Sequence, residues 1–402
     1  MKNKAWLITI IVFLAGVVFS AGNYKVPATM VVVMEDMHTS MTMGGWLMSL
    51  GIVAGIILAL PAGGIMTKTG PKKMGLFSLA CALAGNVIGG LAPNFSVLMF
   101  GRLIEGIGFG LIGVVAPAII AMLFPPEKRG LPMAVWTLWI GVGLLFIFTA
   151  TNAVLPAFGW RGVWWLVAIL AAIDLVLFTI FVQLPESEAE ISGQEKFKPE
   201  QVSVIEGFKS PGSWLLGIIF GCYAFAVQSL ITYIPTFMVQ EAGMDVTTAN
   251  MYSSVLTFGM IGGGITMGFV LSIVKKRTRL LLFSMLLTAI FMYLTFKVTV
   301  PGMIMPFMIA IGLVYSMLPP VIFTVAPDFA ISPATIGVTM GIIILGQNLG
   351  GFVAPILIGA VVEGSGGAWN TATVPLLVVG IVGMISAILL SMVNKKKTVD
   401  NK

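Results

Sequence analysis

The chain has 402 residues, of which 58% are hydrophobic and only 9% are charged. Soluble domains carry about 25% charged residues, so this composition excludes a soluble protein. The net charge of +6 comes from lysines and arginines gathered in short segments between long apolar runs. This distribution indicates a membrane topology and argues against nucleic-acid binding. The two cysteines, Cys81 and Cys222, each lie in an apolar run and indicate neither a disulfide framework nor a zinc site.

Twelve apolar runs are long enough to cross a bilayer, which takes about 20 residues of α-helix. In chain order these runs are 5–33, 44–66, 74–92, 95–123, 132–157, 162–184, 213–239, 248–274, 280–299, 302–326, 335–362 and 372–393. Six precede the longest polar stretch and six follow it. We therefore predict an all-α integral membrane protein with an N-terminal six-helix bundle (1–184), a cytoplasmic linker (185–211) and a C-terminal six-helix bundle (212–402).

The two halves are related by an internal repeat. Much of the stretch from Gly51 to Lys73 recurs without a gap, so that Gly51 corresponds to Gly259 and Lys68 to Lys276. Repeats in an apolar chain are typical of transporters whose substrate site lies between the repeats, near the middle of the membrane.

The loop charges fix the orientation, because lysines and arginines that flank membrane spans favour the cytoplasmic side. With the N-terminus inside, 18 of the 22 lysines and arginines fall in cytoplasmic segments, and only Arg161 and Lys297 lie outside. We predict a multi-pass protein of the cell (inner) membrane, with both termini and the linker 185–211 in the cytoplasm.

Two motifs resemble those of the major facilitator superfamily. The segment from Gly63 to Lys73, GGIMTKTGPKK, resembles the family's signature loop between its second and third helices. The segment from Arg102 to Gly110, RLIEGIGFG, resembles the motif of its fourth helix, an arginine followed by alternating glycines. Through the twelve spans, the repeat and the loop charges, the resemblance covers nearly the whole chain. It implies two pseudo-symmetric six-helix bundles around a central cavity and secondary transport by alternating access.

The resemblance also implies a gating role for the loop after the second span. The residues that match the family's pattern there are Gly63, Lys68, Gly70, Lys72 and Lys73. The aspartate that the family usually carries in this loop is replaced by Thr67. The acidic part of the family's cytoplasmic latch is therefore missing from this position.

Four ionisable residues lie inside predicted spans, where charges are costly and usually functional. Lys25 either contacts an anionic substrate or extends to the membrane surface. Arg102 and Glu105 share a helix face, so Glu105 either carries a coupling proton beside Arg102 or completes a structural ion pair. Asp174 either carries a proton or is a structural carboxyl.

Neutral polar side chains in the spans are further candidates for the substrate site, although ordinary hydrogen bonding between helices explains each of them equally well. Those that we assign to substrate binding, with Lys25, are Asn23, Tyr24, Gln228, Tyr233, Tyr315, Gln347 and Asn348. The arrangement around Lys25, with Asn23 two residues before it, resembles the superfamily's small-anion permeases, such as organic anion/cation symporters and cyanate-type permeases.

The sequence thus predicts a monomeric secondary transporter of a small anion, by proton symport or anion exchange. Its expected partners are the solute, protons or a counter-anion, and the lipid bilayer. Proton-coupled efflux of amphipathic drugs is the alternative, suggested by 26 methionines and 26 phenylalanines. A polytopic receptor or a membrane enzyme is a remote third class. The sequence carries no nucleotide-binding loop, nucleophile motif or metal-ligand cluster, so we expect no enzyme activity, no cofactor and no metal.

Overall fold

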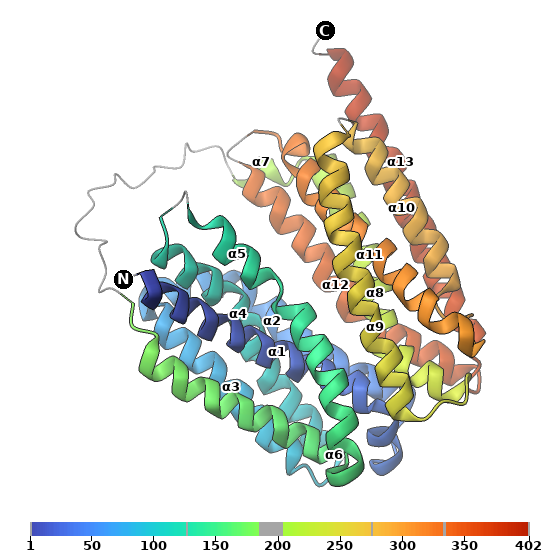
Figure 1. The fold of residues 1–402 in the computed structure, drawn as a ribbon. Helices are drawn as coiled ribbons and strands as arrows, with labels where there is room; N and C mark the ends of the chain where they lie inside the picture. Colours follow the sequence, from blue (N-terminus) through green and yellow to red (C-terminus); the bar gives the residue numbers. More distant parts are fainter. Residues whose placement is uncertain (1, 126–127, 185–203, 275, 333–334, 401–402) are drawn as a thin grey trace. The chain divides into compact units, whose positions relative to one another are not determined.

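The computed structural model describes the whole chain except residues 1, 126–127, 185–203, 275, 333–334 and 401–402. Every regular element among the described residues is a helix (Figure 1). Contacts between Cα atoms divide the chain into two compact units. Unit 1 comprises Met1–Ser192 with Asp245–Ser254, and unit 2 comprises Gly193–Met244 with Val255–Lys402. Most of the predicted linker falls outside the described residues, so the predicted domain boundaries stay predictions.

Unit 1 contains six helices and the first turns of a seventh. The six are α1 (Lys2–Asp36), α2 (Met41–Thr69), α3 (Pro71–Gly90), α4 (Phe95–Leu123), α5 (Gly130–Thr137) and α6 (Trp139–Phe181). Two of the helix starts are capped by side chains, because Ser40 accepts a hydrogen bond from the Met43 backbone and Asn94 from that of Val97. Helix α3 packs between α4 and α6, and α1 packs along α6 and α4. These contacts bring α1, α3 and α4 together around the buried charges.

Eleven stretches of described helix are long and apolar enough to cross a membrane. The longest, Leu131–Phe181, has 51 residues, which corresponds to about 77 Å of helix, more than twice the ~30 Å hydrocarbon core. Its backbone breaks at Gly159, where φ is 64° and ψ is −174°. Non-glycine residues rarely adopt this conformation. The stretch therefore comprises the two spans predicted at 132–157 and 162–184, which confirms the fold of twelve spans.

Unit 2 contains α7 (Val204–Gly207), α8 (Pro211–Gln240), α10 (Arg277–Leu294), α11 (Pro301–Phe329), α12 (Ile336–Gly364), the 3-10 helix η4 (Trp369–Ala372) and α13 (Thr373–Asp400). Helix α9 (Val246–Ile273) belongs to this unit after Ser254. Helix α8 is the centre of the unit, because α11, α12 and α13 all pack on it. Its end is fixed by the Trp369 ring, which lies 5.9 Å from the Tyr233 ring and 5.5 Å from the Phe237 ring, centroid to centroid.

A polar contact fixes the C-terminal end of α1. The Asp36 carboxylate accepts hydrogen bonds from the Trp160 indole at 2.9 Å and from the Arg161 guanidinium at 2.8 Å. Arg161 also donates to the Ala92 carbonyl at 3.2 Å, just beyond the end of α3. The contact ties α1 to the part of α6 that follows Gly159, and so helps to fix the position of the buried charges along α1.

We expect Gly159→Ala to lower the free energy of unfolding by about 1–3 kcal/mol, because alanine is strained at this backbone conformation. No atom lies within 4 Å of the added methyl group, so the effect isolates the backbone. Gly113→Ala in α4 is the matched control, since its methyl group also meets no atom within 4 Å but its φ is helical. That variant should be neutral or slightly stabilised. Thermal unfolding in detergent measures both, and equal stability of the two would contradict the assignment of a strained break.

Candidate functional site

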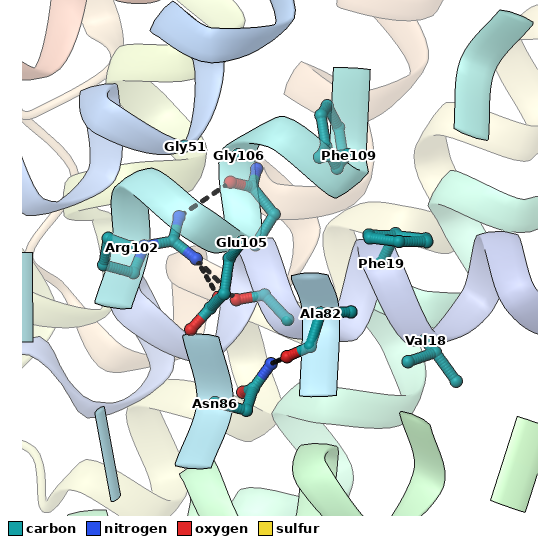
Figure 2. Close-up of a pocket in the computed structure, with 11 residues that line it drawn as sticks. Val18, Phe19, Gly51, Ala82, Asn86, Arg102, Glu105, Gly106 and Phe109 are labelled. Atoms are coloured by element: carbon teal, nitrogen blue, oxygen red, sulfur yellow. Dashed lines mark hydrogen bonds and ion pairs between the residues drawn. The ribbon is translucent and has the colours of Figure 1, made fainter. Parts of the chain in front are cut away.

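A small cavity in unit 1 is polar on one side and apolar on the other. Figure 2 shows Arg102 and Glu105 of α4 turned toward each other, with Asn86 of α3 below them and Phe19 and Phe109 across the cavity. Its volume is about 10 Å³, which is room for about one water molecule. Asn23, Asn86, Arg102 and Glu105 bring four polar side chains together at this cavity, inside a unit built from apolar helices.

The core of the site is one carboxylate shared by two cations. Glu105 Oε2 accepts a hydrogen bond from Arg102 Nη1 at 2.6 Å and another from Lys25 Nζ at 2.7 Å. The predicted pairing of Arg102 with Glu105 is thus present, and Lys25 joins it from 80 residues away in the sequence. Lys25 is 0% exposed, which excludes the alternative that it extends to the membrane surface.

Arg102 also holds the surrounding helices in place. Its Nε donates to the Leu47 carbonyl of α2 at 3.1 Å, and its Nη1 donates to the Gly22 carbonyl of α1 at 3.0 Å. Its Nη2 donates to Asn23 Oδ1 at 3.0 Å. All three guanidinium nitrogens are therefore used, and the side chain links α1, α2 and α4 besides neutralising Glu105. Asn23, a predicted substrate-binding residue, serves here as a partner of Arg102.

Two further residues enclose the Lys25 ammonium, and neither was among the predicted site residues. Asn86 Oδ1 accepts from Lys25 Nζ at 2.6 Å, while Asn86 Nδ2 donates to the Ala82 carbonyl at 2.8 Å and so orients the amide. The Trp164 ring lies against the ammonium, with 4.7 Å between Nζ and the ring centroid. The sequence carried a signal for Asn86, the one amide side chain in the run 74–92. It carried none for Trp164.

The cluster of Lys25, Arg102 and Glu105 contains two cations and one carboxylate, a net charge of +1 when all three are ionised. The second carboxylate oxygen, Glu105 Oε1, is buried and has no hydrogen-bond partner among the described residues. An uncompensated charge inside an apolar unit is costly, and so is an unpaired buried acceptor. The arrangement is therefore suited to bind an anion beside the cations or a hydrogen-bond donor at Oε1.

Asp174 lies apart from the cluster. It shares the buried face of α6 with Val167, Ala171 and Phe178, at helical spacing, and is 3% exposed. Neither of its carboxylate oxygens has a hydrogen-bond partner in the described part of the chain. Both of its predicted roles, proton carrier and structural carboxyl, remain open.

Three of the other six predicted substrate-binding residues make hydrogen bonds within their units. Tyr233 donates its hydroxyl to the Pro355 carbonyl at 2.6 Å, Tyr315 pairs with Thr295 at 3.0 Å, and Gln228 donates to Thr232 at 3.4 Å. The remaining three are half-buried: Tyr24 against the core of unit 1, and Gln347 and Asn348 on α12. Their assignment to substrate binding stays a prediction.

The predicted gating loop is very short. Gly70, with φ of 80°, is the one residue between α2 and α3, and its N–H donates to the Met66 carbonyl at 2.8 Å. Lys72 donates to the Thr179 carbonyl in the last turn of α6 at 3.1 Å, and Lys73 is exposed. Gly63 and Lys68 belong to α2, but the environment of their side-chain positions lies outside the described part.

We expect Asn86→Leu to destabilise the protein by about 1.5–3 kcal/mol, because the buried ammonium of Lys25 loses an acceptor. Asn152→Leu is the matched control, since the Asn152 carbonyl oxygen has no partner in the described structure and its removal should cost little. Thermal unfolding in detergent compares the two variants. Similar stabilities would show that the Lys25–Asn86 hydrogen bond contributes nothing measurable.

The two-unit helical fold, with charges buried among spans, is that of a polytopic membrane protein, and comparison with known sequences gives its family. The sequence profile of the Major Facilitator Superfamily matches residues 12–330 and 216–402. The chain belongs to this superfamily, as its motifs suggested.

Three bacterial relatives illustrate the range of the family. The "Uncharacterized MFS-type transporter YhcA" of Bacillus subtilis (strain 168) is 29% identical over 194 residues, 46% of this chain and 35% of the relative. The "Putative niacin/nicotinamide transporter NiaP" of the same organism is 25% identical over 217 residues, 54% of this chain and 53% of the relative. The "Probable galactarate/D-glucarate transporter GarP" of Escherichia coli (strain K12) is 23% identical over 307 residues, 68% of each chain. The matches thus span between about a third and two thirds of these relatives.

Solved structures give the same fold. A D-xylose-proton symporter aligns over 96% of this chain and 97% of its own, with a TM-score of 0.73 and 16% identity. A bacterial homologue of the human lysosomal transporter Spinster, in an inward-facing and unoccupied conformation, aligns over 97% of this chain and 98% of its own, with a TM-score of 0.73 and 16% identity. At this identity the likeness concerns the fold alone.

Proposed function

We propose that the protein is a secondary active transporter that moves a small anionic solute, a carboxylate or a similar anion, across the cytoplasmic membrane. Transport proceeds by alternating access and is coupled to protons as symport, or to exchange against another anion. The observation that carries this proposal is the pair of buried cations, Lys25 and Arg102, that share the single carboxylate of Glu105, which gives a net charge of +1 when all three are ionised.

The charge excess favours an anion because charges are expensive inside a membrane protein unless they are compensated. A monoanion beside Lys25 would bring the cluster to neutrality. Lys25 has three donor hydrogens, and two of them are directed at Asn86 and Glu105, which leaves one for a ligand. Arg102 already donates from every nitrogen, so Lys25 is the cation that we assign to the solute.

The names of relatives support the solute class and the coupling ion. GarP is named for galactarate and D-glucarate, and NiaP for niacin and nicotinamide. Galactarate, D-glucarate and niacin are carboxylates, whereas nicotinamide is neutral. A further relative, the galactose-proton symporter of Escherichia coli (strain K12), is 24% identical over 198 residues and is named for proton coupling.

Glu105 offers a direct link between proton and anion. A proton added at the unpaired Oε1 would cancel the negative charge that now neutralises one of the cations. Lys25 would then need another anion, and the solute would supply it. Proton and solute would thus favour each other's binding, which is the requirement for symport. In exchange, a second anion would replace the first beside Lys25 without a proton.

We expect Lys25→Ala to weaken binding of the solute by about ten- to a hundred-fold, because one charge-assisted hydrogen bond, worth roughly 1.5–3 kcal/mol, is lost. A thermal-shift screen of carboxylates, inorganic anions and amines first supplies the ligand, since a specific ligand stabilises the protein by mass action. Titration in nanodiscs then measures affinity for the wild type, Lys25→Ala and Lys25→Arg. The arginine variant should recover part of the loss, because a planar fork replaces a compact ammonium.

Two comparisons make that measurement specific. Lys128→Ala removes the same charge from an exposed position and should leave affinity unchanged. Asn86→Asp adds a carboxylate at the acceptor position 2.6 Å from Lys25 Nζ, which neutralises the cluster but gives up the hydrogen bond to the Ala82 carbonyl. It should weaken anion binding as Lys25→Ala does. Unchanged anion affinity in both cluster variants would remove the anion assignment and favour the alternative, efflux of amphipathic drugs.

We expect Glu105→Gln to abolish accumulation driven by a pH gradient while exchange of solute across the membrane continues. Glutamine keeps an oxygen that can accept a hydrogen bond from Lys25 or Arg102, but it cannot take up and release the proton. Uptake into proteoliposomes with and without a pH gradient measures accumulation, and counterflow measures exchange in the same preparation. Full accumulation by the variant would reduce Glu105 to a structural role and direct the search to Asp174.

The topology completes the proposal. We place both termini and the segment 185–211 in the cytoplasm, supported by the 18 cytoplasmic cations against two outside. With this orientation α8 begins at the cytoplasmic face, and the Asp36–Arg161 contact lies at the opposite face.

A further inference from the structure

The two oxygens of the Glu105 carboxylate differ in their surroundings. Oε2 accepts hydrogen bonds from Lys25 and Arg102, whereas Oε1 is buried and has no hydrogen-bond partner among the described residues. Glu105 lines the small cavity of unit 1 and is only 5% exposed. A buried acceptor without a partner is costly. The free Oε1 therefore indicates a donor that the protein itself does not supply.

The polar neighbours of Glu105 at this cavity are already engaged elsewhere. Every guanidinium nitrogen of Arg102 donates to another acceptor. The Asn86 amide accepts from Lys25 and donates to the Ala82 carbonyl. On the opposite side the lining is apolar and includes the Phe19 ring (Figure 2). A group that enters the cavity is thus the donor that Oε1 can gain without breaking a contact of the protein.

The cavity has room for one small polar group. Its volume of about 10 Å³ is that of about one water molecule, and a hydroxyl group needs similar space. A solute carboxylate beside Lys25 would bring its nearest substituent close to Oε1, because Lys25 Nζ lies 2.7 Å from the other oxygen of the same carboxylate. A hydroxyl on the carbon next to the solute's carboxylate matches this short spacing.

We propose that the solute is a hydroxycarboxylate, whose carboxylate binds beside Lys25 and whose neighbouring hydroxyl donates to Glu105 Oε1. This inference rests on the proposed function, because it takes the solute to be an anion at Lys25. A hydroxyl can also accept a hydrogen bond, so it would keep its partner when the proposed coupling proton occupies Oε1. A keto oxygen can only accept, and it would face the ionised carboxylate without a hydrogen bond. A zwitterionic amino acid has no net charge and would leave the charge of the cluster uncompensated.

Carboxylates that differ at a single substituent test the proposal on the full chain in nanodiscs. Titration compares lactate with propionate, which lacks the hydroxyl, and with pyruvate, which carries a keto oxygen in its place. Malate and succinate repeat the first comparison for dicarboxylates. Lactate should bind about ten-fold more tightly than propionate or pyruvate, and malate about ten-fold more tightly than succinate, because a hydrogen bond to a charged group is gained.

Two results would overturn the proposal. Equal affinities within each set would assign Oε1 to a water molecule, while the anion assignment, measured by Lys25→Ala, would stand. Absence of binding by all five carboxylates would exclude a simple hydroxycarboxylate, and the titration of Lys25→Ala with the ligand from the thermal-shift screen would then decide on the anion assignment separately.

A substitution at Glu105 changes the preference between hydroxyl and keto oxygen. In Glu105→Gln the two cations select the amide oxygen, so the amide nitrogen takes the place of Oε1 and offers a hydrogen. Pyruvate should then gain about ten-fold on lactate relative to the wild type. Glu241→Gln, exposed at the end of α8, is the matched control and should keep the preference for lactate. An unchanged preference in Glu105→Gln would contradict the contact, and the wild-type comparison decides even where this variant fails to fold.

Discussion

The hydrogen bonds to a single oxygen of Glu105 are the interaction on which the interior of unit 1 depends. Lys25 and Arg102 are both almost fully buried, and a pair of buried cations would repel each other strongly in a medium that screens charge poorly. The shared carboxylate makes their proximity possible. Because Arg102 also binds backbone carbonyls of α1 and α2, the charge balance at Glu105 and the packing of three helices are linked. A change of protonation at this carboxylate would therefore act on the helices as well as on a ligand.

Much of the fold was predictable because its signals are local. Long apolar runs gave the spans, and the glycines and basic residues of the loop after the second span indicated the family. The two spans joined through Gly159 were visible as separate runs in the sequence, and the backbone of α6 breaks between them. The sequence placed their boundary correctly because Gly159 and Arg161 interrupt the apolar run where the chain turns.

The candidate site was predictable only in part, and the reason is physical. Ionisable residues stand out in apolar runs, so Lys25, Arg102 and Glu105 could be found, and a spacing of three on one helix indicates pairing. The contact between Lys25 and Glu105 depends on how α1 packs on α4, which no local pattern encodes. Two of the four acceptors of Arg102 are backbone carbonyls, a group that every residue carries. Trp164 was undetectable because its role depends on the packing of its ring and not on its sequence neighbours.

The short link at Gly70 has a mechanical consequence. A single residue between α2 and α3 limits how far the two helices can slide along their axes, so a movement of α2 relative to α3 would take the form of a tilt about Gly70. Leu47 lies 23 residues from this pivot, about 34 Å along a helix that moves as a rod. A tilt of about 5° would displace the Leu47 carbonyl by roughly 3 Å, as far as its whole 3.1 Å separation from Arg102 Nε. A tilt of α2 about Gly70 would therefore move the Leu47 carbonyl, near the other end of the helix, relative to the buried Arg102 guanidinium.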